Sequence, residues 1–569
     1  RRLLTGNAKT RLLVRMDTDS KNDNDIAELD RQLKRRSIHE QKTPDTGLSD
    51  PLADQGYYLF TIGEKEVTHE VISLHVELPS IKQVAIFLQC ISALSEAATT
   101  AGLPQLLIQG FPPPVDHTVS WTTITPDPAV IEINMAPQPD IAFFYAANQE
   151  LFEIASRLEL SPYRLQYNGT VSDSGGGGQF TIGGRTAESS PFFTAPNLLP
   201  RLVKYFNLHP SLSYIFATDY VGSGSQSPRA DEGTRDAFHE LIVALELLQR
   251  QSDISPEFLW ASFAPFLADA SGNSHRSELN IEKLWNPRLP MRGCLGLLEF
   301  RAFRMPFSPQ RSAAIALLLR ATIMMLVDHD LAPRLHDWGD ELHERFSLPL
   351  FLYEDLGTVF KDLEHKGPGL APCIQAELLN EPHRPNWSVT FAGCQLSIEQ
   401  AIDFWPLVGD VASQESGGSR LVDSSTLRLQ ISLRNQGPCD KLLADWQLQT
   451  AEFDVPLRSE KDDMGEVRLI GLKFRDFMPW RGLHPAIMPT GPVSLYLSHP
   501  AEDNALEVSL HSWRADGAPY AGLPEDLDEA AQRRAERFIV KKIPRTDIPP
   551  AVTPSAQAVS AFTLDLRRL

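Results

Sequence analysis

Two neighbouring stretches in which side chains alternate in character, 271–282 and 297–303, constrain the fold of this chain most strongly. A period of two residues is typical of β-strands, so both stretches are predicted strands joined by a turn. Each strand would gather its polar and charged side chains on one face. These side chains are Arg276, Glu278, Asn280 and Glu282 on the first strand, and Glu299 and Arg301 on the second.

A sheet face that carries both carboxylates and guanidinium groups has two interpretations. Such groups are costly when they are buried without partners. They are useful if the face binds a divalent metal and phosphate, because hard cations bind carboxylate oxygens and arginine pairs with phosphate. The other interpretation is a solvated face of an antiparallel sheet whose charges form ion pairs. The two stretches alone leave both interpretations open.

The net charge of −20 argues against non-specific binding to nucleic acid or to an anionic membrane surface. The longest apolar run, 313–327, is interrupted by Arg320, so no membrane span is predicted. The five cysteines have neither metal-binding nor redox spacing, and a reducing, cytoplasmic location is expected. Because the chain opens on Arg1 rather than Met, we expect that a segment precedes it.

The 569 residues are enough for about two to four domains. Residues 1–56 carry charge without apolar periodicity and are a predicted disordered linker. Residues 57–370 mix strand and helix signals without a regular βαβ rhythm, which favours an α+β domain with an antiparallel sheet and helices on one side. The predicted helices are 80–102, 148–158, 236–249, 313–328, 340–346 and 356–363, and the predicted strands include 106–109, 130–135, 179–182 and 212–221.

The pattern of secondary-structure signals in the sequence changes after residue 370. Alternating stretches between turn signals predict a β-sandwich-like domain of about seven strands over 371–512. One helix, 398–405, is expected to interrupt it. We expect this domain to contribute no ligand-binding side chain, because its sequence shows no cluster of carboxylates or histidines at catalytic spacing. Residues 513–569 are a predicted tail that is helical and contains proline.

The glycine tract Gly175, Gly176, Gly177 and Gly178 precedes the predicted strand 179–182. Glycines let a backbone approach a ligand closely, although a flexible loop is the alternative.

The acidic pair Asp231 and Glu232 could join a site or cap the next helix. Three histidines are further candidates, but their spacings do not converge on one metal, so they are predicted to be core or surface residues. These candidates are His336, His343 and His365.

Several spaced segments, in order, resemble the amidoligase domain of bacterial transglutaminase-like proteins, a domain of unknown function. The resemblance spans roughly 72–538 and is carried by segments 125–134, 210–216, 272–276, 298–303, 422–425, 428–430 and 483–485. It implies a remote relationship to the fold of glutamine synthetase and glutamate–cysteine ligase. In that fold an antiparallel sheet binds magnesium and ATP through carboxylates on its strands. The family also implies a transglutaminase-like partner or a missing N-terminal domain.

The resemblance implies roles for individual residues. Glu132 and Glu299 match metal-binding glutamates of that fold, and Glu278, on the predicted charged face, is the third candidate metal ligand. Arg276 and Arg301 match arginines that contact nucleotide phosphate, with His275 beside the first. Gly175 to Gly178 match the glycine-rich entry over the nucleotide. The chain departs from the family pattern in one respect, because no histidine lies between Asn168 and Gly184.

The resemblance therefore predicts an ATP- and magnesium-dependent ligase that joins a small-molecule or peptide carboxylate to an amine. Arg276, Arg301 and His275 are its predicted catalytic residues. Because histidine can serve as ligand, acid or base, its absence near the glycine tract bears on turnover more than on nucleotide binding. The alternative is a non-catalytic relative that binds nucleotide or partner peptides. ATP-dependent phosphotransfer without ligation is a third reading, since one fold hosts several chemistries.

Overall fold

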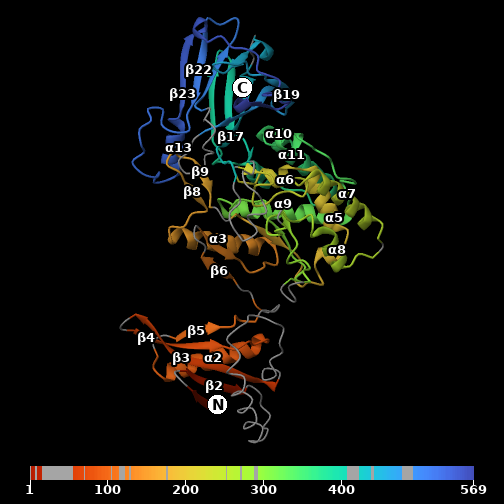
Figure 1. The fold of residues 1–569 in the computed structure, drawn as a ribbon, viewed down its shortest axis with the longest axis vertical. Helices are drawn as coiled ribbons and strands as arrows, with labels where there is room; N and C mark the ends of the chain where they lie inside the picture. Colours follow the sequence, from red (N-terminus) through yellow and green to blue (C-terminus); the bar gives the residue numbers. More distant parts are fainter. Residues whose placement is uncertain are drawn as a thin grey trace. The chain divides into compact units, whose positions relative to one another are not determined.

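The computed structural model describes residues 2–6, 9–15, 55–68, 71–103, 106–114, 119, 122–126, 130–174, 177–218, 220–251, 253–269, 272–287, 293–405, 422–437, 441–476 and 491–568 (Figure 1). The chain forms two compact units. Unit 1 comprises Arg1–Thr123 and Asn134–Pro137, and unit 2 comprises Ile124–Ile133 and Gln138–Leu569. The expected domain 57–370 is thus shared between the units, and the expected boundary at residue 370 lies inside unit 2.

Unit 1 is built on a five-stranded sheet in the order β1-β2-β3-β4-β5. Its strands pair antiparallel except β4 and β5, which are parallel and are connected through helix α2. Residues 2–15, which we expected to be linker, contribute the first two strands, whereas 16–54 lie outside the described residues. The elements are β1 (Arg2–Gly6), β2 (Lys9–Arg15), β3 (Tyr57–Thr68), β4 (Val71–Leu78), α2 (Val84–Thr100) and β5 (Leu106–Gly110).

The first part of unit 2 is a helical layer around α9 (Pro309–Asp328). Ser308 caps this helix by accepting a hydrogen bond from Arg311 N at 3.0 Å, and Pro309 suits its first turn. By length and composition α9 could cross a membrane, but 72% of its most apolar window is buried within the protein. The other helices are α3 (Ile141–Arg157), α4 (Pro191–Thr194), α5 (Leu198–Leu208), α6 (Ser211–Tyr214), α7 (Arg235–Gln249), α8 (Pro256–Phe263), α10 (Glu341–Arg345), α11 (Pro349–Lys366) and α12 (Pro372–Leu379).

The strands in this part form small sheets rather than one continuous antiparallel sheet. The protein is therefore α+β as expected, while a glutamine-synthetase-like arrangement stays a prediction. The three-stranded sheet β10-β13-β12 places Glu299 opposite Thr181 on one side and Asn280 on the other. The strands are β6 (Thr123–Pro126) with β7 (Ile131–Asn134), β8 (Tyr163–Leu165) with β9 (Val171–Asp173), β10 (Phe180–Ile182), β12 (Leu279–Asn280), β13 (Leu298–Phe300), and β11 (Tyr220–Val221) parallel to β16 (Asp403–Phe404).

Two strand predictions in this part are wrong. In the described part of the predicted strand 271–282, residues 272–282, only Leu279 and Asn280 are strand, because Asp269 and Asn273 accept hydrogen bonds from the local backbone and stabilise turns. Asp269 Oδ1 accepts from Asn273 N at 3.1 Å, and Asn273 Oδ1 accepts from His275 N at 3.0 Å. In the segment 212–221, residues 212–214 belong to α6 and 220–221 to β11, while 215–218 form neither helix nor strand.

The second part of unit 2 contains two sheets that share one hydrophobic core, as expected for a sandwich (Figure 1). One sheet has the order β14-β15-β17-β20-β19 with β24 pairing β20, and the other has the order β18-β21-β22-β23. Ile431 and Leu472 from the first sheet and Leu495 and Val508 from the second belong to the same core. The strands are β14 (Asn386–Phe391), β15 (Cys394–Gln400), β17 (Thr426–Asn435), β18 (Gln447–Gln449), β19 (Arg458–Asp462), β20 (Gly465–Arg475), β21 (Val493–Ser498), β22 (Asn504–Leu510), β23 (Phe538–Pro544) and β24 (Thr563–Asp565).

Two expectations about this part differ from the structure. The predicted helix 398–405 is absent, because Ile398 continues the inward alternation of β15 and pairs with Ile431 across the sheet. The tail 513–569 contains α13 (Leu527–Ala535) as expected, but it also supplies β23 and β24 to the two sheets. The tail is therefore part of the sandwich.

Candidate functional site

A pocket of about 740 Å³ in unit 2 is the candidate site. The pocket is lined by residues from several places in unit 2. Among these are the β8–β9 ribbon, α6, the chain after β13, and β11 with the residue that follows β16. The lining contains two arginines, Arg164 and Arg301, of which only Arg301 was predicted from the sequence. The lining includes Arg164, Asp173, Gly177, Gln179, Ser213, Tyr214, Tyr220, Arg301 and Trp405.

The charge of this lining favours an anion. Arg164 and Arg301 bring two positive charges, and within the described part of the chain Asp173 is the one carboxylate that lines the pocket. The Asp173 carboxylate accepts a hydrogen bond from Met305 N at 3.1 Å. A locally cationic pocket in a chain of net charge −20 is suited to phosphate or carboxylate groups, which arginine binds through paired hydrogen bonds.

Arg301 is held by two neighbours. Its Nη1 donates to Glu299 Oε1 at 2.5 Å and to Gln179 Oε1 at 3.2 Å. Glu299 Oε2 also accepts from Lys283 Nζ at 3.0 Å, so two cations share this buried carboxylate. The Nε of Arg301 is buried and has no hydrogen-bond partner in the structure, although the side chain is 15% exposed. Arg301 is therefore positioned at the pocket with a donor still unused.

The glycine segment lies directly beside Arg301. Gly178 N donates to Phe303 O at 2.9 Å. A Cβ at Gly178 would lie 2.6 Å from Arg304 O and 2.5 Å from Pro306 Cδ, so only glycine fits here. Gly177, at φ +76°, lines the pocket. Part of the predicted glycine entry is thus adjacent to the predicted phosphate-binding arginine, while Gly175 and Gly176 lie outside the described residues.

Two consecutive hydroxyl residues of α6 connect the pocket to buried carboxylates. Ser213 Oγ donates to Glu278 Oε2 at 2.5 Å and accepts from Arg229 Nη1 at 3.0 Å. Burial raises the pKa of Glu278 to about 7, although Arg229 lowers it. The Tyr214 hydroxyl donates to Glu232 Oε1, which also lies 2.8 Å from His343 Nε2. Asp231 accepts from Arg229, so the acidic pair joins this network beneath the pocket.

The remaining predicted residues lie elsewhere. His275 Nε2 is 3.1 Å from Glu282 Oε2, and Arg276 Nε is 4.0 Å from Asp269 Oδ2, at the turn before β12. Glu132 is exposed on the β6–β7 ribbon, outside the sheet that carries Glu299. Within the described ranges, no group of three or more histidine, cysteine or acidic side chains could hold a metal, so Glu132, Glu278 and Glu299 do not form one.

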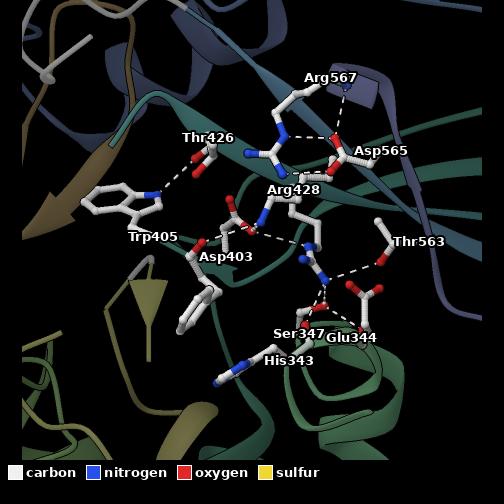
Figure 2. A network of polar contacts seen from close by, with 12 residues as sticks. His343, Glu344, Ser347, Asp403, Trp405, Thr426, Arg428, Thr563, Asp565 and Arg567 are labelled. Atoms are coloured by element: carbon white, nitrogen blue, oxygen red, sulfur yellow. Dashed lines mark hydrogen bonds and ion pairs between the residues drawn. The ribbon is translucent and has the colours of Figure 1, made fainter. Parts of the chain in front are cut away.

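Sequence reasoning missed a buried charged network where the sandwich meets α10 and α11 (Figure 2). Arg428 Nη1 donates to His343 O at 2.8 Å and to Ser347 Oγ at 2.6 Å, and Lys473 Nζ is 2.9 Å from Asp403 Oδ1. Nearby, Asp423 accepts from Arg475 and Ser425. The signal in the sequence was the charge at Arg428 and Lys473 inside otherwise apolar alternating strands.

The same region brings an aromatic side chain to the pocket. Trp405 lies inside the segment that we expected to contribute nothing to ligand binding, yet it lines the pocket and stacks on Tyr220. The ring centroids are 3.9 Å apart and the planes differ by 10°. The pocket is therefore composite, with part of its wall from the sandwich.

Residues 15–567 match the model of a family described as "Putative amidoligase enzyme (DUF2126)". The chain belongs to this family. Neither the curated proteins nor the solved structures contain a match. The matched residues include both parts of unit 2. The family description points to an enzyme that forms carbon–nitrogen bonds.

Proposed function

We propose that this amidoligase family member uses ATP to join a carboxylate to an amine in the pocket lined by Arg164 and Arg301. The observation that carries the proposal is the cationic lining of this pocket, which has Arg301 fixed beside a glycine segment. Its volume of about 740 Å³ suits a nucleotide with a small substrate. Family membership supplies the reaction class.

The proposed reaction has two steps. A carboxylate oxygen attacks the γ-phosphorus of ATP, ADP leaves, and an acyl phosphate forms. The amine nitrogen then attacks the acyl carbon, the C–O bond to phosphate breaks, and an amide and inorganic phosphate are released. The neutral amine nitrogen loses one proton, which goes to the departing phosphate or to solvent. The two arginines would stabilise charge on the transferring phosphoryl group, where positioning and electrostatics provide most of the catalysis.

Magnesium does not fit the three predicted glutamates as they are arranged. Glu299 already contacts Lys283 and Arg301, and Glu278 contacts Ser213 beside Arg229. Glu132 lies on a different ribbon. Magnesium enters this proposal only as the ion that accompanies ATP in solution, and no step depends on a protein-bound metal.

Trapping with hydroxylamine tests the proposal without knowledge of the natural amine. The protein is incubated with ATP, pooled carboxylates and hydroxylamine, and hydroxamate and ADP are measured. An acyl phosphate gives both products in equal amounts. Arg301→Ala should abolish them, whereas Arg235→Ala, which removes an exposed ion pair with Asp337, should not. ADP without hydroxamate across the pool would contradict ligation.

A non-catalytic nucleotide-binding role is the second candidate. It is favoured by the absence of histidine between Asn168 and Gly184, where the family pattern is expected to carry it. In that case ATP binds with a similar dependence on Arg301, but neither ADP nor hydroxamate accumulates.

A further inference from the structure

The pocket combines two kinds of surface that come from different elements. Arg164 is on β8, and Arg301 follows β13. Tyr220 is on β11, and Trp405 directly follows β16. A ligand that uses both surfaces needs an anionic group and a flat, apolar group.

The aromatic surface is fixed by contacts at three consecutive residues. Trp405 Nε1 donates to Thr426 O at 3.0 Å (Figure 2). Phe404 stacks on His343, with centroids 4.2 Å apart. Asp403 lies 2.9 Å from Lys473 Nζ and 3.4 Å from Arg428 Nε. The Trp405 ring therefore loses little conformational freedom when a ligand binds, which favours affinity.

The backbone around Tyr220 packs closely against the segment that precedes Trp405. Tyr220 and Val221 pair in parallel with Asp403 and Phe404. At Gly222, φ is +100° and an added Cβ would lie 1.9 Å from the Phe404 ring. Glycine is thus required for β11 to approach β16 closely enough for Tyr220 to stack on Trp405.

We propose that Tyr220 and Trp405 form the stacking platform for the base of the nucleotide, with the phosphates toward Arg164 and Arg301. The inference rests on the proposed function, since it takes ATP as the ligand, and it adds a base-binding subsite from the sandwich. Planar bases gain free energy by stacking on aromatic rings. The platform also gives the charged network of Figure 2 a role, because Asp403 and Arg428 position β16, the strand that Trp405 directly follows.

Calorimetry with ATP and inorganic tripolyphosphate separates the base from the phosphates. Tyr220→Ala should weaken ATP binding about tenfold or more, which is the size of a base-stacking contribution, and should leave tripolyphosphate binding unchanged. Tyr220→Phe keeps the ring and should bind ATP like the wild type. Phe258→Ala, at an exposed aromatic residue on α8 outside the pocket lining, is the control.

Fluorescence gives a second readout that does not depend on removing a ring. Trp405→Phe retains an aromatic surface but removes one of nine tryptophans. ATP should quench the wild-type emission, and this quenching should be absent in Trp405→Phe, whereas tripolyphosphate should quench neither protein.

The outcomes distinguish this inference from the proposed function. If ATP binds the wild type but Tyr220→Ala binds it equally well, the platform is wrong and the ATP site stands. Equal losses for ATP and tripolyphosphate would also overturn the platform, because they indicate a merely structural role. If ATP does not bind the wild type, the proposed function fails and the platform fails with it.

Discussion

Arg301 and Glu299 lie two residues apart at the end of β13 and form an ion pair, with Nη1 2.5 Å from Oε1. Lys283 approaches the other oxygen of the same carboxylate at 3.0 Å. A carboxylate shared by two cations has little capacity left for a metal. Glu299 therefore acts in this structure as the residue that positions Arg301 at the pocket.

Glu299→Gln tests this role. It keeps the shape but removes the charge, and should lower the free energy of unfolding by about 1–3 kcal/mol, because hydrogen bonds to charged groups are lost. ATP affinity should keep the same dependence on magnesium as in the wild type. Glu246→Gln, which removes an exposed pair with Arg250, should cost little and serves as the control. Loss of only the magnesium-dependent binding would instead identify Glu299 as a metal ligand.

Glu278→Gln should change how stability depends on pH. Burial raises the pKa of Glu278 from an ordinary 4.5 to about 7, so the folded state binds a proton more tightly than the unfolded state. The contribution of Glu278 to stability is complete below pH 4.5 and is lost as the pH rises through 7. Relative to the wild type, the variant should gain on the order of 3 kcal/mol across this window, as measured by urea unfolding. A constant difference between pH 4.5 and 7 would contradict the raised pKa.

Asp403→Asn should destabilise the protein by about 3–5 kcal/mol at neutral pH, because it leaves buried cations without their partner. Burial alone would raise the pKa of Asp403, but Lys473 and Arg428 hold it below its ordinary value of 3.8. The stability from Asp403 is present above pH 3.8 and decreases as the pH falls through the folded-state pKa. Denaturant unfolding measures the difference from the wild type. Asp337→Asn, at an exposed pair, is the control, and an equally small effect of both variants would refute the argument.

Gly222→Ala should destabilise the β11–β16 pair for two reasons, an unfavourable positive φ and a collision with Phe404. Gly465→Ala is a matched control, because Gly465 has φ +110° and open space around its added Cβ. The control isolates the backbone cost, which is about 1 kcal/mol. Thermal unfolding should show a clearly larger loss for Gly222→Ala. Equal losses would mean that the close approach to Phe404 is relaxed at little cost.

Much of the fold followed from local patterns. The predicted helix 313–328 lies within α9 and 236–249 lies within α7, because their apolar faces are long and periodic. The prediction of strand at 273–276 is wrong. The alternation in side-chain character does not reveal that Asp269 and Asn273 accept hydrogen bonds from the local backbone, which stabilise a turn instead of a strand. The apolar segment 212–221 has no period that separates a strand from a short buried helix.

The site was predictable only where family motifs and geometry coincide. Arg301, Gly177 and Gly178 belong to segments quoted from the sequence, and they lie together. Arg164 and Trp405 come from segments about 240 residues apart, and no local pattern relates two residues that meet only through the tertiary fold. Glu278 was recognised as important, but its partners Ser213 and Arg229 become neighbours only through α6 and the loop before α7.

Calorimetric titration of ATP into the wild type, Arg301→Ala and Arg235→Ala tests the central claim most directly. We predict saturable binding to the wild type and to Arg235→Ala. Arg301→Ala should bind ATP about 10- to 100-fold more weakly, as expected when charged hydrogen bonds to phosphate are lost. Absence of binding to the wild type, or the same affinity in all three proteins, would contradict the assignment of this pocket as the ATP site of a ligase.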